Sequence, residues 1–286
     1  MGKISESIHR VPAPPLDAYV AWYSGFREAG VGPMVHRGLP SPYLTLIFTL
    51  YEPLTVAAHP DPTQPSDIYQ TLVGGLHATP AVITHQGSQS GIQVALSPLG
   101  ARAILGLPAG EIAMADFHGT DVLGPVAVEL QARLQEADGW SERFAILDAY
   151  LFTRLARSDG PPVPVERAWR HLVGAGGAVQ VESIAAEVGW SSRHLRQRFE
   201  REIGLAPRTA SRVIRFDRAR RLLALRANSG HPIELADLAA RCGYFDQAHL
   251  CRDFGRFAGR PPLRWLAEEF RNVQYVDWGE AAELTS

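Results

Sequence analysis

One segment occurs twice in the C-terminal half of the chain, and this repeat restricts the fold more than any other feature of the sequence. Ala185 and Gly189 align with Ala239 and Gly243 at a shift of 54 residues. Four more positions align at a shift of 55 residues: Leu195 with Leu250, Phe199 with Phe254, Gly204 with Gly259 and Pro207 with Pro262. The second copy therefore has one extra residue at its turn, where Tyr244 and Phe245 stand against Trp190. Such self-similarity predicts two copies of one supersecondary unit.

The first copy has the pattern of two short helices joined by a glycine turn. The segment 181–188 predicts a helix, and Ala185 is small enough for a second helix to cross close over it. Gly189 can adopt the left-handed conformation that ends a helix without steric cost. Ser191 is of a type that caps the next helix, because its hydroxyl accepts a hydrogen bond from an amide of the first turn. This pattern predicts a helix-turn-helix unit.

The second copy follows the same order. A support helix is predicted over 233–242, with the turn at Gly243. Asp246 is the expected N-cap, and its charge suits the positive end of the helix dipole. Between the copies, the segment 209–226 predicts one long helix that holds the two units at a fixed separation. Its expected buried residues are Val213, Phe216, Ala219 and Leu223.

The second helix of each unit separates apolar from polar residues. Leu195 and Phe199 in the first unit, and Leu250, Phe254 and Phe257 in the second, are expected to face the core. The outward residues are of the types that DNA reading needs, because an α-helix fits the major groove, where arginine can bond guanine and glutamine can bond adenine. These outward residues are Arg193, Arg196 and Gln197 in the first unit, and Gln247, His249, Cys251 and Arg252 in the second.

The strings AAEVGWSSRHLRQRFEREIGLAP and LAARCGYFDQAHLCRDFGRFAGRPP resemble the DNA-binding domain of the AraC/XylS family of bacterial transcription regulators. The resemblance implies a sequence-specific regulator, more often an activator, that binds promoter DNA and acts with RNA polymerase. It places Arg193, Arg196, Gln197, Gln247, Cys251 and Arg252 on the base-reading faces. His249, Cys251 and Gly255 depart from the usual residues. Contacts with DNA phosphates, which give affinity without sequence information, are expected from Ser191, Arg198, Arg208, Arg215 and Arg256.

Charge and proline content divide the chain into segments. Residues 1–162 carry a net charge of −6 and residues 163–272 a net charge of +7. A basic segment suits a polyanion, although a solvated surface explains the charge equally well. We expect an effector-binding or dimerisation domain over 1–157, a proline-rich linker over 158–164, an AraC-type DNA-binding domain over 165–272 and an acidic tail over 273–286.

The N-terminal region predicts strands followed by helices. Four segments have strand composition: 43–50, 68–73, 82–85 and 92–96. The expected fold class is therefore α+β, with a small β-sheet or cupin-like barrel plus helices, then an all-α domain with two helix-turn-helix units. Trp22, Tyr43, Phe48 and Tyr69 are candidates for an apolar pocket that binds a small-molecule effector, or they belong to the core. The apolar stripe 144–155 is either a homodimer face or packs on the sheet. A variant of the hypothesis makes this domain an oligomerisation module without a ligand.

The remaining features predict what the protein lacks. His36, His59, His77 and His85 have no spacing typical of a metal site, so we expect no metal and no cofactor. The two cysteines, Cys242 and Cys251, are too few for a disulfide framework. No apolar run has the roughly 18 residues of a membrane helix. DNA-repair enzymes with a similar domain need a zinc-bound cysteine cluster, which this sequence lacks. We therefore predict a cytoplasmic regulator that is not an enzyme.

Overall fold

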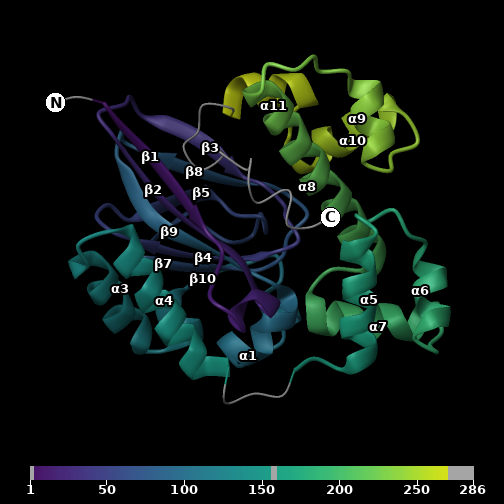
Figure 1. Cartoon of the computed structure of the whole chain (residues 1–286), viewed down its shortest axis with the longest axis horizontal. Helices are drawn as coiled ribbons and strands as arrows, with labels where there is room; N and C mark the ends of the chain where they lie inside the picture. The colour runs from purple at the N-terminus through teal and green to yellow at the C-terminus, as the bar shows by residue number, and fades with distance from the viewer. Residues whose placement is uncertain (1–2, 156–159, 270–286) are drawn as a thin grey trace.

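The protein is described by a computed structural model that covers residues 3–155 and 160–269. Its N-terminal part contains two antiparallel sheets with flanking helices, and its C-terminal part is helical (Figure 1). This arrangement confirms the predicted α+β fold class. Of the other predicted segments, 158–159 in the linker and the acidic tail 273–286 lie outside the described residues.

The two sheets face one another across an apolar layer. The six-stranded sheet has the order β1 (Ile4–Arg10), β2 (Val20–Ala29), β9 (Gln89–Leu96), β4 (Leu44–Thr49), β7 (Thr71–Gly74) and β10 (Asp116–His118). The four-stranded sheet has the order β3 (Met34–Gly38), β8 (Ala81–His85), β5 (Leu54–Ala58) and β6 (Asp67–Tyr69). The layer between them is formed by Phe26, Ile47, Leu54, Val56, Tyr69, Leu72, Ala81 and Ile83.

Each of the four predicted strand segments contains a strand. The segment 68–73 differs from the prediction because the chain passes from one sheet to the other within it. Tyr69 ends β6 in the four-stranded sheet, and Thr71 begins β7 in the six-stranded sheet. The carbonyl of Gln70, between them, accepts from the amide of Thr49 at 3.0 Å. A continuous β-branched and aromatic run does not reveal such a crossing.

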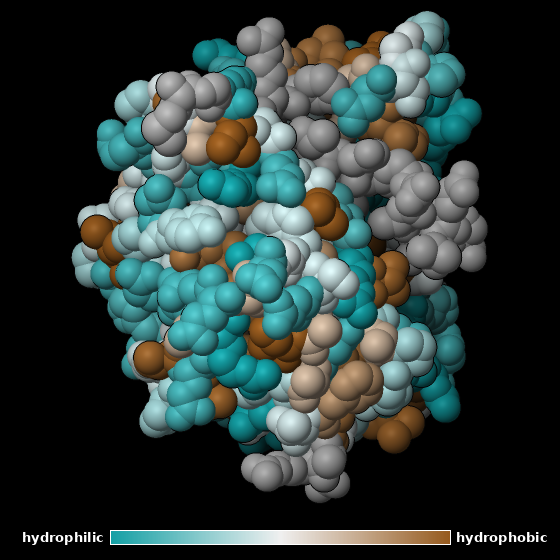
Figure 2. All heavy atoms as spheres, turned by 60° about the vertical axis from the view of Figure 1, so that its left-hand side comes forward, coloured by the Kyte–Doolittle hydropathy of each residue, from teal (hydrophilic) through white to brown (hydrophobic). Residues whose placement is uncertain are grey.

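Helices cover the outer face of the six-stranded sheet. They are α1 (Ala101–Leu105), α2 (Gly119–Leu123), α3 (Val126–Glu136) and α4 (Trp140–Leu155), with short 3-10 turns η1 (Leu16–Ala18), η2 (Pro98–Gly100) and η3 (Ala109–Ile112). Phe144, Leu147 and Leu151 of α4 are buried, and Phe144 stacks on Tyr23 of β2 at 5.8 Å between ring centroids. The apolar stripe of α4 therefore packs on the sheet. The face seen in Figure 2 is mainly hydrophilic, with apolar groups as scattered spots.

The C-terminal part contains the two predicted units. Its helices are α5 (Val163–Gly174), α6 (Val181–Glu187), α7 (Ser192–Ile203), α8 (Pro207–Asn228), α9 (Leu235–Arg241), α10 (Gln247–Phe257) and α11 (Pro262–Glu269). The first unit is α6–α7 and the second is α9–α10, with the long helix α8 between them (Figure 1). Val163 and Pro164, predicted as linker residues, form the first turn of α5.

The N-terminal part docks on the C-terminal end of α7. The guanidinium of Arg102 in α1 donates two hydrogen bonds to the carboxylate of Glu202, at 2.8 and 3.0 Å. Gly110 of η3 lies so close to α7 that an added Cβ would be 2.2 Å from the carbonyl oxygen of Arg201. One apolar cluster runs through both parts, including Ile112 of η3 and Ile203 of α7. The two parts therefore share one continuous core.

We predict that Gly110→Ala destabilises the protein by about 1–3 kcal/mol, the usual range for overpacking a well-packed contact. The added methyl group meets backbone atoms of α7, which cannot move aside as a flexible side chain would. Urea unfolding of the full chain measures the change. The matched control is Gly139→Ala, whose Cβ meets nothing within 4 Å. Equal free energies of unfolding for the two variants would contradict the prediction.

Candidate nucleic-acid interface and ligand cavity

The turn of the first unit has the local geometry that its sequence predicts. Gly189 has a φ of 74°, in the left-handed region. The Ser191 hydroxyl accepts from the backbone amide of His194 at 3.2 Å, which confirms Ser191 as the N-cap of α7. Leu195 and Phe199 are fully buried beneath the helix. These interactions determine the direction in which α7 leaves the turn.

The predicted reading residues of α7 are exposed. Arg193, Arg196 and Gln197 all lie on the solvent side of the helix. The guanidinium of Arg196 donates to Glu200 at 3.1 Å, one turn further along, yet its side chain remains 68% exposed. The N-terminal part of the molecule contacts the other end of α7, so it leaves this half accessible.

The second unit repeats this geometry with an additional support. Gly243 has a φ of 71°, and the Asp246 carboxylate accepts from the backbone amide of His249 at 2.6 Å. Arg215 of α8 donates to the carbonyl of Gly243 at 3.3 Å, and its guanidinium lies 5.5 Å from the ring centroid of Tyr244. Asp246 is therefore the N-cap of α10, and Arg215 of α8 supports the turn through its contacts with Gly243 and Tyr244.

The outward residues of α10 differ in exposure. Gln247 and Arg252 are exposed, and Cys251 is half-buried. Burial raises the pKa of the Cys251 thiol above its ordinary value. Burial also raises the pKa of Cys242 to about 11, so that this thiol stays protonated at neutral pH. Both cysteines therefore lack the thiolate character of reactive cysteines.

The five predicted phosphate-binding residues lie in different settings. Arg208 is 78% exposed and pairs with Glu182. Arg256 is exposed, with its guanidinium 5.8 Å from the centroid of the Phe257 ring. Arg198 is half-buried, and the hydroxyl of Ser191 is used in the helix cap. Arg215 is bonded to the turn of the second unit, as described above.

Helix α8 joins the two units through its buried face. Phe216 packs against Phe254 and Phe257 of α10, with ring centroids 5.0 and 5.3 Å apart. Arg212 donates to the buried carboxylate of Asp253 at 2.6 Å. On the side of the first unit, the Ser211 hydroxyl donates to the carbonyl of Gly177 at 2.6 Å. The long helix thus contacts structure on both sides.

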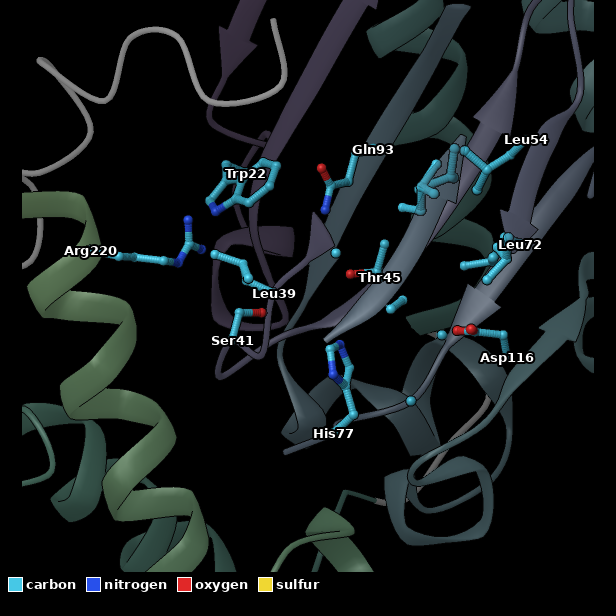
Figure 3. A pocket seen from close by; sticks show the side chains of 17 residues that line it. Trp22, Leu39, Ser41, Thr45, Leu54, Leu72, His77, Gln93, Asp116 and Arg220 are labelled. Carbon is cyan, nitrogen blue, oxygen red and sulfur yellow. The ribbon is translucent and has the colours of Figure 1, made fainter. Parts of the chain in front are cut away.

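A cavity of about 90 Å³ lies between the two sheets and reaches α8 (Figure 3). Its walls are largely apolar, with Leu39, Ile47, Leu54, Val56, Leu72, Ala81 and Ile83. Its polar lining residues are Ser41, Thr45, His77, Gln93, Asp116 and Arg220. Arg220 comes from α8, so a residue of the helical part borders a cavity of the β-sheet part. Apolar walls with a few convergent polar groups are typical of ligand sites.

One of the four aromatic residues predicted for a pocket lines this cavity. Trp22 is at its edge near Arg220 (Figure 3). The other three, Tyr43, Phe48 and Tyr69, do not line it. Side chains alternate along a strand, so Thr45 and Ile47 of β4 point into the cavity while Phe48 joins the core under the helices. Tyr69 is buried in the layer between the sheets. The ring of Tyr43 faces α8, with its centroid 5.6 Å from the guanidinium carbon of Arg221.

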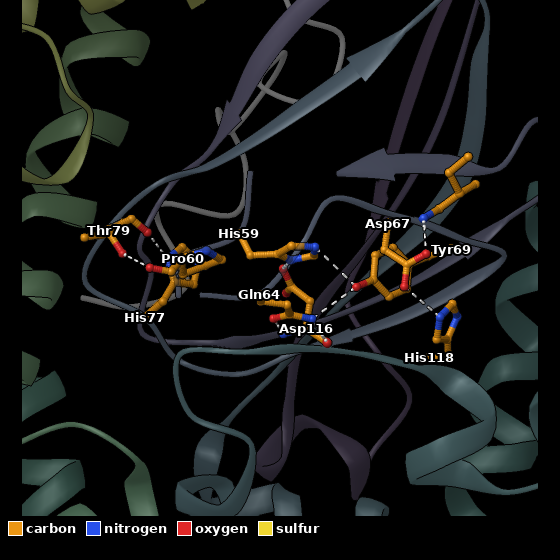
Figure 4. A network of polar contacts seen from close by, with 10 residues as sticks. His59, Pro60, Gln64, Asp67, Tyr69, His77, Thr79, Asp116 and His118 are labelled. Atoms are coloured by element: carbon orange, nitrogen blue, oxygen red, sulfur yellow. Dashed lines mark hydrogen bonds and ion pairs between the residues drawn. The ribbon is translucent and has the colours of Figure 1, made fainter. Parts of the chain in front are cut away.

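A polar network holds the loop that follows β5 against β10 (Figure 4). His59 Nδ1 lies 2.6 Å from the Asp116 carboxylate, and the Gln64 side chain bonds both the carbonyl and the amide of Asp116, at 2.6 and 3.1 Å. Asp116 also borders the cavity. Within the described residues, no group of three or more His, Cys, Asp or Glu side chains has the arrangement of a metal site. The network therefore positions the loop.

His77 offers a hydrogen-bond acceptor to the cavity. Burial lowers its pKa below the ordinary value, so the ring is neutral at pH 7. Nδ1 lies 2.5 Å from the carbonyl oxygen of Thr79. Because a carbonyl only accepts, Nδ1 carries the proton and Nε2 is the acceptor.

Arg220 was not among the predicted site residues, although its position in the sequence contained a signal. Phe216 and Leu223 are buried, and Arg220 lies between them on the same side of the helix, at spacings of four and three residues. Its side chain is 7% exposed and donates to Asp217 at 2.6 Å. A charged residue within an apolar stripe indicates a buried polar contact. The strand residues of the cavity carried no comparable signal, because lining a cavity and packing in a core require the same residue types.

The fold and the two exposed helix faces define a DNA-binding transcription regulator. Residues 184–268 match the family described as a helix-turn-helix domain, and residues 8–117 match a domain of unknown function, DUF6597. The helix-turn-helix match supports a regulator similar to those of the AraC/XylS family. A search of curated protein sequences finds no match. Among the residues that the structure covers, no helix has the length and apolarity needed to cross a membrane.

Solved structures of similar fold include ToxT from Vibrio cholerae, with a TM-score of 0.51 and 11% sequence identity over 86% of this chain and 97% of that chain. ToxT of strain SCE256 with a bound unsaturated fatty acid also gives a TM-score of 0.51, at 9% identity over 94% of this chain and 97% of that chain. At this level of identity the similarity concerns the fold.

Proposed function

We propose that this protein is a ligand-responsive transcription activator, in which a small molecule bound between the two sheets changes how the helix-turn-helix units engage promoter DNA. The observation that carries the proposal is the position of Arg220, which belongs to the helix that joins the two units and also lines the cavity. A ligand that contacts Arg220 acts directly on α8. The ligand shifts the equilibrium between a DNA-competent and a DNA-incompetent state. The size of this shift is set by how much more tightly the ligand binds the DNA-competent state.

The proposed domain division follows from this function. Residues 1–157 form the effector-binding or dimerisation domain, and residues 165–272 form the DNA-binding domain. In the latter, Arg193, Arg196, Gln197, Gln247, Cys251 and Arg252 read bases. Ser191, Arg198, Arg208, Arg215 and Arg256 contact phosphates, and Arg215 must then leave its place at the turn of the second unit. RNA polymerase, a homodimer and a cytoplasmic location belong to the same proposal.

Two observations support a ligand. The similar structure of ToxT contains an unsaturated fatty acid. The cavity of this chain combines apolar walls with several polar groups, as an amphipathic small molecule requires. Its volume of about 90 Å³ is below the roughly 300–1,000 Å³ of sites for drug-sized ligands. A ligand of that size therefore needs the sheets or α8 to move apart, and such a movement is what would couple binding to the DNA-binding units.

We predict that Arg252→Ala lowers the affinity for a duplex selected from a random pool by about 1–3 kcal/mol and relaxes the preference at one base pair. The exposed guanidinium at the outer face of α10 is suited to bond a guanine. Competition binding against duplexes with single base changes measures both effects. The control Arg256→Ala should weaken binding uniformly and reduce the salt slope by about 1. A uniform loss with Arg252→Ala would reassign that residue to a phosphate.

We predict that Ala81→Leu abolishes stabilisation by an effector without abolishing DNA binding. The larger side chain fills part of the cavity, which Ala81 lines. A thermal-shift screen of the full chain with small metabolites first identifies compounds that raise the unfolding temperature. The control is Ala57→Leu, at an exposed position of the neighbouring strand β5. Equal stabilisation of both variants would place the ligand elsewhere, and no stabilising compound at all would favour a pure oligomerisation domain.

A further inference from the structure

The turn of the second unit carries an aromatic side chain that the first unit lacks. Phe245 is 93% exposed, more than any other large apolar residue in the described parts of the chain. It directly precedes Asp246, the N-cap of α10. Full exposure of a phenyl ring forfeits the favourable burial that such a side chain usually obtains. The ring is therefore accessible to a binding partner.

Ring contacts identify Phe245 as the inserted residue. In the first unit, the Trp190 ring lies edge-on to His194, with ring centroids 4.6 Å apart at 84°. In the second unit, the Tyr244 ring lies edge-on to His249 in the same way, at 5.1 Å and 89°. Tyr244 is therefore the structural counterpart of Trp190, since each aromatic packs on the histidine of its own recognition helix. Phe245 has no counterpart in the first unit.

The backbone around Phe245 is held on both sides. The amide of Tyr244 donates to the carbonyl of Ala239 at 2.9 Å, and the Tyr244 ring is buried. On the other side, the Asp246 carboxylate caps α10. The exposed ring is thus attached to a turn that hydrogen bonds hold to both helices of the unit. A rigid attachment reduces the entropy lost when the ring meets a partner.

The exposed neighbours of Phe245 are those of a DNA-reading surface. Gln247 follows the cap, and Arg252 lies further along the exposed side of α10. The N-terminal residues of a recognition helix are the ones that reach base edges in the major groove. The apolar group that the major groove presents is the C5-methyl of thymine, which apolar side chains contact. A single exposed aromatic ring beside polar reading residues is therefore suited to contact a thymine methyl group in the major groove.

We propose that Phe245 contacts a thymine methyl group in the half-site bound by the second unit and so determines specificity at that base pair. The assignment rests on the proposed DNA-binding function. It implies that the two half-sites differ, because the first unit has no equivalent side chain.

The test compares thymine with deoxyuridine, which lacks only the methyl group. A duplex is selected by the full-length protein from a random pool, and each thymine in it is replaced in turn. Fluorescence anisotropy at a fixed salt concentration gives the affinities. At one or two positions, the wild-type protein should bind the deoxyuridine duplex roughly fourfold more weakly, the factor expected from about one buried methyl group.

Phe245→Ala should bind the thymine duplex more weakly and show no difference between thymine and deoxyuridine at those positions. Phe245→Leu should retain part of the difference. Val163→Ala, at another exposed apolar position of the helical part, should behave as the wild-type protein. Because Phe245 is exposed, its replacement should leave the unfolding temperature unchanged, so a loss of binding is not a loss of folding.

Each other outcome counts against the assignment in a recognisable way. If Phe245→Ala keeps the full preference for thymine, the assignment is wrong, and a protein becomes the alternative partner of the exposed ring. If Phe245→Ala weakens binding but the wild-type protein does not distinguish thymine from deoxyuridine, the contact is with the sugar-phosphate backbone. If no duplex is enriched, both the proposed function and this assignment fail. If Arg252→Ala weakens binding to the enriched duplex and Phe245→Ala does not change it, the proposed DNA-binding function stands and the assignment of Phe245 fails.

Discussion

The burial of α8 against both helix-turn-helix units is the constraint on which the arrangement of the molecule depends. Phe216 is fully buried between the rings of α10, and Ser211 bonds the loop after α5. Ion pairs at the edge of this face, such as Arg212 with Asp253, add directional contacts. Because packed interiors resist deformation, a helix held in this way transmits displacement of one unit to the other. We therefore expect the two exposed faces to keep a fixed separation.

The same helix connects the DNA-binding units with the sheets. Arg220 borders the cavity, and Arg221 lies 5.6 Å from the centroid of the Tyr43 ring. A second connection does not involve α8: Arg102 bonds Glu202 near the end of α7, and η3 packs on the same end. The N-terminal part thus contacts the first unit at its recognition helix and approaches the second through α8. A change between the sheets has two physical routes to the exposed faces of α7 and α10.

The sequence was informative where local rules decide the structure. The glycine turns at Gly189 and Gly243, the caps at Ser191 and Asp246 and the long helix between the units all follow from the repeat and from local propensity. The sequence was less informative where contacts between distant segments decide. The crossing of the chain between the sheets at Gln70 and the docking of Gly110 on α7 depend on segments far apart in the sequence. For the same reason, three of the four aromatic residues predicted for a pocket belong to packed surfaces, and the cavity instead receives Arg220 from the other domain.

We propose that α8 holds α7 and α10 at one fixed separation. Recognition helices of one rigid body that read a single face of the duplex address half-sites about 10–10.5 base pairs apart. The direct measurement is the affinity of the full-length protein for its selected duplex before and after about five base pairs, half a helical turn, are inserted between the half-sites. We expect the insertion to lower the affinity to that of a single half-site. An affinity that is unchanged by the insertion would contradict it, because the two units would then move independently.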